Sequence, residues 1–279
     1  MASGQSMRRL ILPLMEQIKQ SILRIAYPPL LEYAPEGWNT VLAADETGGW
    51  NALSVVTAEK EKWDLFCNLV KGTGPLGFSH EQAELTSNSD VSFHNLHVTY
   101  GYVLALAAHQ KSRLSMLDYG GGLGHYYQLG KALLPDVKLD YHCKEMPRVA
   151  EAGKLLNPEI QWFTNDSCLK KNFDLVMIGG SLQYIERWQD FLQAVAPAVG
   201  EYLFLNRTPV VEKSASFVAV QKAYGTEMLH WQFNRATLLQ TVENAGFGIV
   251  REFVLGDRHY IRRAPEQCEL RSWLFRKIR

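Results

Sequence analysis

The stretch LDYGGGLGHYY, residues 117–127, joins a run of apolar residues to a segment with helical spacing. We expect a β-strand over residues 114–119 and an α-helix over residues 124–134, with the glycines in the connection. Glycine lets the backbone turn sharply and approach a ligand without a Cβ clash, and the first turn of a helix presents unpaired N–H groups. The sequence therefore predicts a ligand-binding strand–loop–helix unit, for which a glycine-rich turn without a ligand is the alternative.

The spacing of the glycines distinguishes two classes of cofactor. The nicotinamide fingerprint G-x-G-x-x-G needs a glycine where the chain has His125 or Tyr127, so it fails in both registers. The pattern that the chain does contain is D-x-G-x-G-x-G, through Asp118, Gly120, Gly122 and Gly124. This pattern is typical of enzymes that bind S-adenosylmethionine (SAM), in which an acid such as Asp118 helps to hold the amino group, directly or through water. We therefore expect SAM as cofactor and S-adenosylhomocysteine (SAH) as its product.

Apolar strands and helices alternate on the carboxyl side of this loop. Further strands are expected at residues 138–143, 160–164, 173–178 and 202–206. Helices are expected at residues 94–109, before the first strand, and at residues 187–195. Short apolar strands that alternate with helices indicate a parallel sheet covered on both faces, which is an α/β fold.

The end of the chain carries a different signal. After a helix over residues 235–245, two strands are expected at residues 248–255 and 258–262, joined by Gly256 and Asp257. A two-residue turn of this kind suits a tight hairpin, so the last strand should run antiparallel. A seven-stranded, mostly parallel sheet with an antiparallel last strand is the layout of the Rossmann-like class I methyltransferase fold. We place this domain at residues 93–265, between a mainly helical N-terminal extension (1–92) and a basic C-terminal tail (266–279).

Small and acidic residues follow the other strands, where their carboxyl ends should meet. Glu145 ends the second strand, 145 − 124 = 21 residues past the last loop glycine, where an acid can accept hydrogen bonds from the ribose hydroxyls. The alternative for Glu145 is a solvent-facing acid at a helix start. Asp166, after the third strand, is a candidate for the adenine amino group or for a helix N-cap. Gly179, Gly180 and Tyr184 follow the fourth strand and should border the reacting methyl group.

Four further residues are candidates for catalysis or acceptor binding. His125, directly after the glycine loop, could be a general base, and the alternative is a histidine that packs at the helix start. Arg207, at the end of the fifth strand, could hold a carboxylate or phosphate of the acceptor, or form a structural ion pair. His230 and Trp231 precede the last helix, where acceptor-binding elements are often inserted, although Trp231 could be a core residue. The sequence contains no cluster of acids typical of a magnesium site, so we expect a metal-free mechanism.

The composition disfavours several classes of protein. The 29 Lys+Arg balance the 29 Asp+Glu of the 279 residues, which argues against binding nucleic acid through the overall field. No apolar run approaches the ~18 residues that span a bilayer. The four cysteines form no CxxC pair, which favours a reducing, cytoplasmic setting. Residues 7–26 have an apolar helical face, which we expect to pack on the domain or on a homodimer partner, with a membrane surface as the alternative.

Five stretches carry a resemblance to a known family. They are LDYGGGLGHYY (117–127), KEMPRVAEAG (144–153), GGSLQYI (179–185), LNRTPV (205–210) and FVAVQ (217–221). They resemble LDxGGxxGxxY, VVExPxxVxxG, SGxLQYI, DRTP and LTVQ, in the same order, of bacterial class I SAM-dependent methyltransferases often encoded near surface-polysaccharide genes. The chain departs from this family at His125, where a small residue is usual, and at Asn206, where Asp is frequent. The resemblance covers residues 114–253 and implies SAM as methyl donor, without fixing the acceptor.

Three kinds of function stay open. The first is a SAM-dependent O-methyltransferase that acts on a small molecule or carbohydrate, with N- or C-methylation as the alternative. Such an enzyme mainly has to align acceptor, methyl and sulfur and exclude water, and an oxygen acceptor also needs a base. The second is a nicotinamide-dependent oxidoreductase, which the glycine spacing and the terminal hairpin disfavour. The third is a non-catalytic partner subunit, which the intact Asp118 and Glu145 disfavour.

Overall fold

The computed structural model describes residues 31–42, 48–80 and 88–278. Its main sheet contains seven strands in the order β4-β3-β2-β5-β6-β11-β9, in which only β11 runs antiparallel to its neighbours. The strands are β2 (Arg113–Tyr119), β3 (Lys138–Lys144), β4 (Gln161–Phe163), β5 (Phe173–Gly179), β6 (Val199–Val211), β9 (Phe247–Val254) and β11 (Glu269–Lys277). The expected α/β fold, with a mostly parallel sheet and an antiparallel last strand, is confirmed. Because the strand order reverses between β2 and β5, their carboxyl ends border a crevice of the kind that binds ligands in such sheets.

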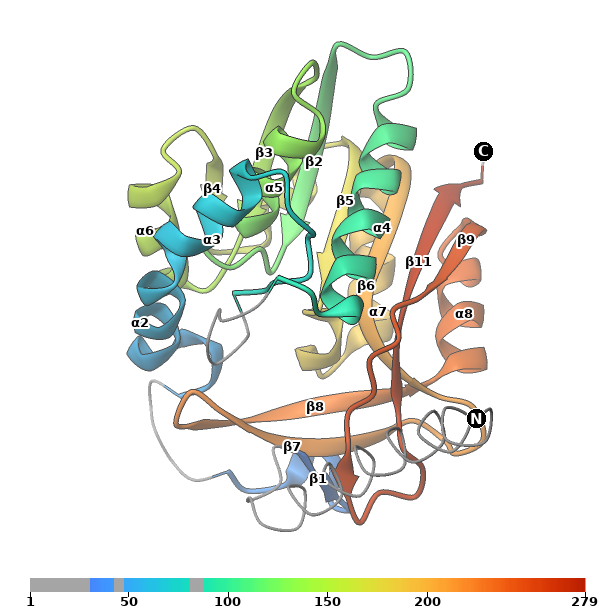
Figure 1. Cartoon of the computed structure of the whole chain (residues 1–279). Coiled ribbons are helices and arrows are strands. Elements are labelled where there is room, and N and C mark those ends of the chain that lie inside the picture. The colour runs from blue at the N-terminus through green and yellow to red at the C-terminus, as the bar shows by residue number, and fades with distance from the viewer. Residues whose placement is uncertain (1–30, 43–47, 81–87, 279) are drawn as a thin grey trace, which may run out of the picture.

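Helices cover both faces of this sheet (Figure 1). They are α4 (Val91–Ala107), α5 (His125–Leu133), α6 (Pro147–Leu156), α7 (Trp188–Val195) and α8 (Arg235–Asn244). On one face, Tyr100 of α4 and Leu129 of α5 are buried in one apolar cluster. On the other face, Trp188 of α7 and Leu238 of α8 are buried in a second cluster. The sheet is therefore apolar on both sides, which explains its continuous apolar strands.

The prediction of a hairpin at Gly256-Asp257 is wrong. The chain does turn at Gly256, where φ is +84°, but it then leaves the main sheet. The next strand, β10 (Ile261–Arg262), pairs in parallel with β1 (Leu31–Ala34). The antiparallel last strand is β11, which lies between β6 and β9. Residues 266–279, expected as a basic tail, thus contain a strand of the main sheet.

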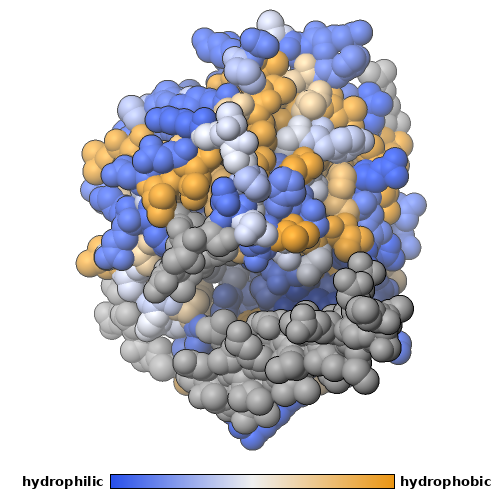
Figure 2. Space-filling view, viewed as in Figure 1, coloured by the Kyte–Doolittle hydropathy of each residue, from blue (hydrophilic) through white to orange (hydrophobic). Residues whose placement is uncertain are grey.

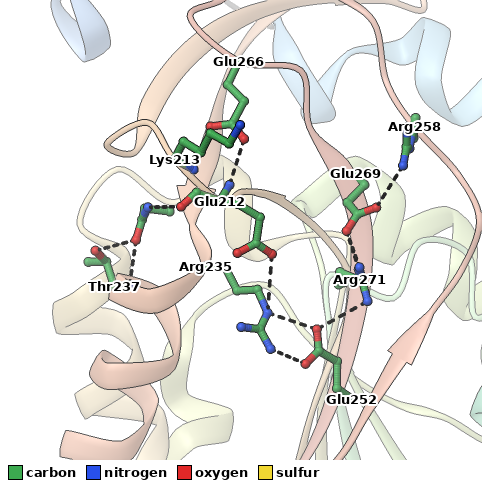
Figure 3. A network of polar contacts seen from close by, with 10 residues as sticks. Glu212, Lys213, Arg235, Thr237, Glu252, Arg258, Glu266, Glu269 and Arg271 are labelled. Atoms are coloured by element: carbon green, nitrogen blue, oxygen red, sulfur yellow. Dashed lines mark hydrogen bonds and ion pairs between the residues drawn. The ribbon is translucent and has the colours of Figure 1, made fainter.

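Burial and charge both explain why β11 occupies this place. A strand inside a covered sheet must be apolar on both faces, and Trp273 and Leu274, which point to opposite faces, are 0% and 1% exposed. A network of ion pairs ties its charged end to the neighbouring elements (Figure 3). There Arg271 pairs with Glu252 of β9 at 3.6 Å, and the same carboxylate accepts a hydrogen bond from Arg235 of α8 at 3.1 Å. Arg271, one of the basic residues that suggested a tail, therefore has acidic partners within the fold.

A smaller sheet continues from the end of β6. β7 (Phe217–Ala223) and β8 (Thr226–Asn234) form a hairpin, whose turn residues Tyr224 and Gly225 have φ of +54° and +73°. β8 pairs with the last residues of β6, and β7 pairs with β1. In Figure 1 the hairpin crosses below the carboxyl ends of the strands of the main sheet. The small sheet therefore faces the edge at which a ligand is expected.

The N-terminal part of the chain adds two helices to the strand β1. α2 (Leu53–Glu61) packs against α6, and α3 (Trp63–Lys71) packs against α5. The helix expected at residues 7–26 lies outside the described residues. None of the helices within the described residues combines the length and apolarity that crossing a bilayer requires.

Candidate functional site

A cavity of about 560 Å³ lies where the carboxyl ends of the main strands face the small sheet. A recess is visible at this level in the space-filling view (Figure 2). The glycine loop, the residues after β5 and the β7–β8 hairpin all contribute to its lining. From the N-terminal part of the chain, the lining includes Trp38, Trp50, Val55, Glu59 and His80. Segments far apart in the sequence thus converge on one space of the size that holds a small molecule or a cofactor.

The glycine loop takes a conformation that only glycine adopts without strain. Gly120, Gly122 and Gly124 have φ of +83°, +56° and +91°. A Cβ on Gly120 would lie 2.4 Å from the Cβ of Ser181, which follows β5. Gly120 and Gly122 line the cavity, whereas Gly124 caps the start of α5 and packs against Asn157. The loop therefore brings bare backbone to the cavity wall, as a closely bound ligand requires.

Glu145 lies at the end of β3 and lines the cavity beside this loop. Its carboxylate accepts a hydrogen bond from the Gly122 N–H at 3.2 Å and one from the Met146 N–H at 2.7 Å. Burial raises the pKa of the Glu145 carboxyl, and these two backbone donors oppose that rise. Because two carboxylate oxygens offer about four acceptor sites, Glu145 keeps the capacity for a ligand's hydroxyl groups.

Asp118, expected to help hold the amino group of the ligand directly or through water, has no direct access to the cavity. It is fully buried, and its Oδ2 accepts a hydrogen bond of 2.6 Å from the Tyr141 hydroxyl. A Cβ on Gly121 would lie 2.5 Å from the same oxygen, so the side chain packs directly against the loop. Asp118 does not line the cavity. The structure therefore gives Asp118 a place behind the loop, from which it can support the loop's conformation.

Asp166 is linked to the cavity through a hydrogen bond with Tyr119. It is exposed and accepts a hydrogen bond of 2.8 Å from the Tyr119 hydroxyl. Tyr119 lines the cavity, and its ring lies 4.6 Å from the ammonium group of Lys144, which lines the cavity as well. Asp166 is not itself in the lining, so it can orient this aromatic wall.

The residues expected to border the reacting methyl group do line the cavity. Gly179 ends β5 and Gly180 follows it, and the Gly180 N–H donates to the Asn206 carbonyl at 2.8 Å. Tyr184 also lines the cavity and donates a hydrogen bond of 2.5 Å to Gln221 of β7. Arg207 of β6 lines the same region with φ of +51°, a left-handed conformation that is rare outside glycine. The carboxyl end of β5, the segment after it and β6 therefore place glycine, aromatic and basic residues on one wall of the cavity.

His125 lies outside the cavity lining, contrary to its expected place beside the cofactor. Its ring stacks on that of His80 at 3.7 Å and meets the ring of Trp63 edge-on at 5.0 Å. Burial lowers the pKa of His125 well below its usual value. The first turn of α5 directs this side chain toward α3, which explains why it packs between aromatic rings. The expected alternative, a histidine that packs at the helix start, describes this position.

The two candidates on β8 also lie outside the cavity lining. His230 is buried, its ring contacts Tyr184 edge-on at 5.0 Å, and burial lowers its pKa to about 3. Trp231 points to the other side of the strand, where its indole N–H donates to the Glu186 carbonyl at 3.2 Å. Other residues of the hairpin supply the lining: Tyr224, Thr226, Glu227, Met228 and Leu229. The sequence thus pointed to the hairpin segment, but the hairpin residues that line the cavity are those nearer the turn between β7 and β8.

No group of three His, Cys, Asp or Glu that could hold a metal ion occurs among residues 31–42, 48–80 and 88–278. The four cysteines are free thiols. Among the described residues, the acids of the cavity lining are Glu59, Glu145 and Glu227, and they come from three separate elements. These carboxylates can accept hydrogen bonds from a ligand.

The fold is similar to that of several solved SAM-dependent methyltransferases. One from Clostridium acetobutylicum is 11% identical with a TM-score of 0.47, over 68% of this chain and 94% of that one. The 1,6-didemethyltoxoflavin-N1-methyltransferase of Burkholderia thailandensis, solved with 1,6-didemethyltoxoflavin and SAH, is 13% identical with a TM-score of 0.46, over 87% and 94%. The magnesium protoporphyrin IX methyltransferase of Synechocystis, solved with SAH, is 14% identical with a TM-score of 0.45, over 80% and 98%. No family model and no curated protein matches the chain. At these identities the similarity concerns the fold.

Proposed function

We propose that this chain is a SAM-dependent methyltransferase that acts on a small-molecule acceptor. The observation that carries the proposal is the pairing of Gly122 with Glu145 on one wall of the cavity. A loop that needs glycine brings its backbone to the ligand space, and a buried carboxylate that ends the next strand is fixed to that backbone. This arrangement suits a nucleoside whose ribose hydroxyls donate to Glu145.

The residues present fit the rest of this cofactor. The cavity wall beside Glu145 includes Tyr119 and Lys144, whose ammonium group lies over the Tyr119 ring, and the bare loop leaves room for the methionine end. When bound, SAM supplies an electrophilic methyl group. Tyr184 and Arg207 lie on the wall after β5 and β6, where they can orient an acceptor toward that group. Apolar side chains of the lining, among them Val55, Met146 and Val149, reduce the contact of a bound ligand with water.

The acceptor that this cavity favours is a small molecule with a flat or ring-shaped surface. Trp50 meets the ring of Tyr184 at 5.1 Å and that of Tyr224 at 5.9 Å, and all three line the cavity. Aromatic walls bind sugar rings and planar molecules by packing against their faces. Arg207 at this wall suits an anionic group on the acceptor. We retain oxygen as the atom methylated, on a small molecule or a sugar.

Ligand-induced stabilisation tests the choice of cofactor. We expect SAH to raise the melting temperature and NADH to leave it unchanged, because only a ligand that binds the folded state stabilises it. Glu145→Gln should weaken SAH roughly 10- to 100-fold, since hydrogen bonds to a charged group contribute about 1.5–3 kcal/mol. Glu151→Gln, on the exposed side of α6, is the matched control and should bind SAH normally. Stabilisation by NADH instead of SAH would refute the proposal.

A further inference from the structure

The methionine end of SAM, the cofactor proposed above, carries an ammonium group that needs a partner in the cavity. A buried ammonium group needs an acceptor, best a carboxylate. Asp118, expected in this role, lies behind the loop, bonded to Tyr141 and outside the cavity lining. Glu145 is already engaged with the loop backbone and suits the ribose. A further acid beside the glycine loop would supply this acceptor.

Glu59 of α2 occupies this position. It is 5% exposed and lines the cavity. A Cβ on Gly122 would lie 3.5 Å from its Oε2, 3.8 Å from its Oε1 and 3.5 Å from Nδ1 of His125, so the carboxylate and the imidazole both face the loop backbone. A further acid of the lining among the described residues, Glu227, lies on β8 and pairs with Lys222 at 3.1 Å. Within the described part of the chain, Glu59 and Glu145 are thus the acids of the lining that approach Gly122.

The helix that carries Glu59 is held against the core of the methyltransferase fold. Val56 of α2 is buried in one cluster with Leu123 of the loop and Val149 of α6. The Arg148 N–H also donates to the Asn51 side chain at 3.2 Å, which anchors the segment before α2. Glu59 is therefore positioned by packing, as a ligand-binding side chain must be.

The electrostatics of this corner favour a cation. Glu59 and Glu145 both approach Gly122, so two buried acids converge on one loop residue. Two carboxylates beside one loop residue can accept hydrogen bonds from a bound ammonium group. Glu59 also lies in the last turn of α2, where the helix dipole favours positive charge.

We propose that Glu59 binds the ammonium group of the cofactor, so that the N-terminal segment completes the cofactor site. The inference rests on the proposed function, and it assigns to α2 a role in discriminating SAM from nucleosides without an amino acid end. Deleting the carboxylate should therefore affect ligands with the amino group and spare those without it.

Three ligands and three proteins test this assignment by calorimetry. The ligands are SAH, its deaminated analogue without the α-amino group, and 5′-methylthioadenosine. The proteins are the wild type, Glu59→Gln and the control Glu61→Gln, an exposed acid on the same helix. We expect Glu59→Gln to weaken SAH roughly tenfold or more, as loss of a hydrogen bond to a charged group does. The other two ligands should bind all three proteins alike, and Glu61→Gln should bind SAH as the wild type does.

Each outcome decides between distinct conclusions. Unchanged binding of SAH to Glu59→Gln overturns the assignment. An equal loss for 5′-methylthioadenosine also overturns it, because Glu59 would then act on the nucleoside. Retained binding of 5′-methylthioadenosine together with loss of SAH supports it and shows that the variant is folded. If the wild type binds none of the three ligands, the proposed function itself fails, and the assignment fails with it.

Discussion

The carboxyl group of Asp118 makes the stability of this protein depend on pH near neutrality. Burial raises its pKa from the ordinary value of 3.8 to about 7, against the opposing hydrogen bond from Tyr141. Between about pH 4 and pH 7 the folded state holds a proton that the unfolded chain releases, so stability falls as the pH rises through this window. Asp118→Asn keeps an acceptor for Tyr141 and removes the titration. Urea unfolding at pH 5, 6, 7 and 8 should show a steeper loss of stability for the wild type than for the variant, and parallel losses would contradict this.

Spacing along the chain predicted which residues reach the ligand-binding edge, but not where each side chain points. Glu145, Gly180 and Arg207 were found from their positions at strand ends, and all three line the cavity. Asp118 follows the same rule in sequence, yet its side chain lies behind the loop. His125 directly follows the loop, and the helix it begins turns it into an aromatic cluster. Side-chain direction depends on packing partners from distant segments, which a local pattern does not contain.

The strand β11 shows how turn chemistry and burial can point to different segments. Gly256 has the positive φ that a turn signal predicts, and the residues after it were therefore expected to be the last strand. The place between β6 and β9 instead goes to Trp273, Leu274 and Phe275, which are apolar on both faces of the sheet. Basic neighbours such as Arg276 suggested a tail because their acidic partners lie in other elements, here Glu201 at 3.0 Å. Three consecutive apolar residues were the stronger signal for a strand inside the sheet.

Replacing Trp273 with alanine tests the position of this strand. Its side chain is 0% exposed in the cluster beneath α7 and α8, so the change leaves a large cavity. We expect the free energy of unfolding to fall by about 3–5 kcal/mol. Arg276→Ala, on the same strand with a side chain 60% exposed, should cost no more than about 1 kcal/mol. Urea unfolding monitored by tryptophan fluorescence and circular dichroism measures both, and similar small costs would place residues 269–277 outside the core.

The cavity belongs to two sheets at once, and this could not be predicted from local patterns. β6 runs from the main sheet into the small one, where its last residues pair with β8. The small sheet joins the hairpin to β1 (Leu31–Ala34) and to β10 (Ile261–Arg262), which come from opposite ends of the described chain. Such pairings depend on contacts far apart in sequence, whereas the glycine loop is a local signal. The residues of the cofactor half of the site could therefore be predicted from the sequence. The wall formed by the hairpin and the N-terminal segment could not be predicted in this way.

Binding of SAH should slow amide hydrogen exchange in two segments that are separate in sequence. The glycine loop and α2 (Leu53–Glu61) both line the cavity, so a ligand held between Glu145 and Glu59 would stabilise them against local opening. The helix α8 (Arg235–Asn244) lies outside the cavity lining and serves as the internal control. Only global stabilisation of the protein would slow amide exchange in α8. Deuterium uptake measured by mass spectrometry should therefore fall in the loop and in α2 more than in α8. Protection of the loop without protection of α2 would show that the cofactor does not reach the N-terminal segment. Equal protection of all three segments would indicate global stabilisation without a site at this edge of the sheet.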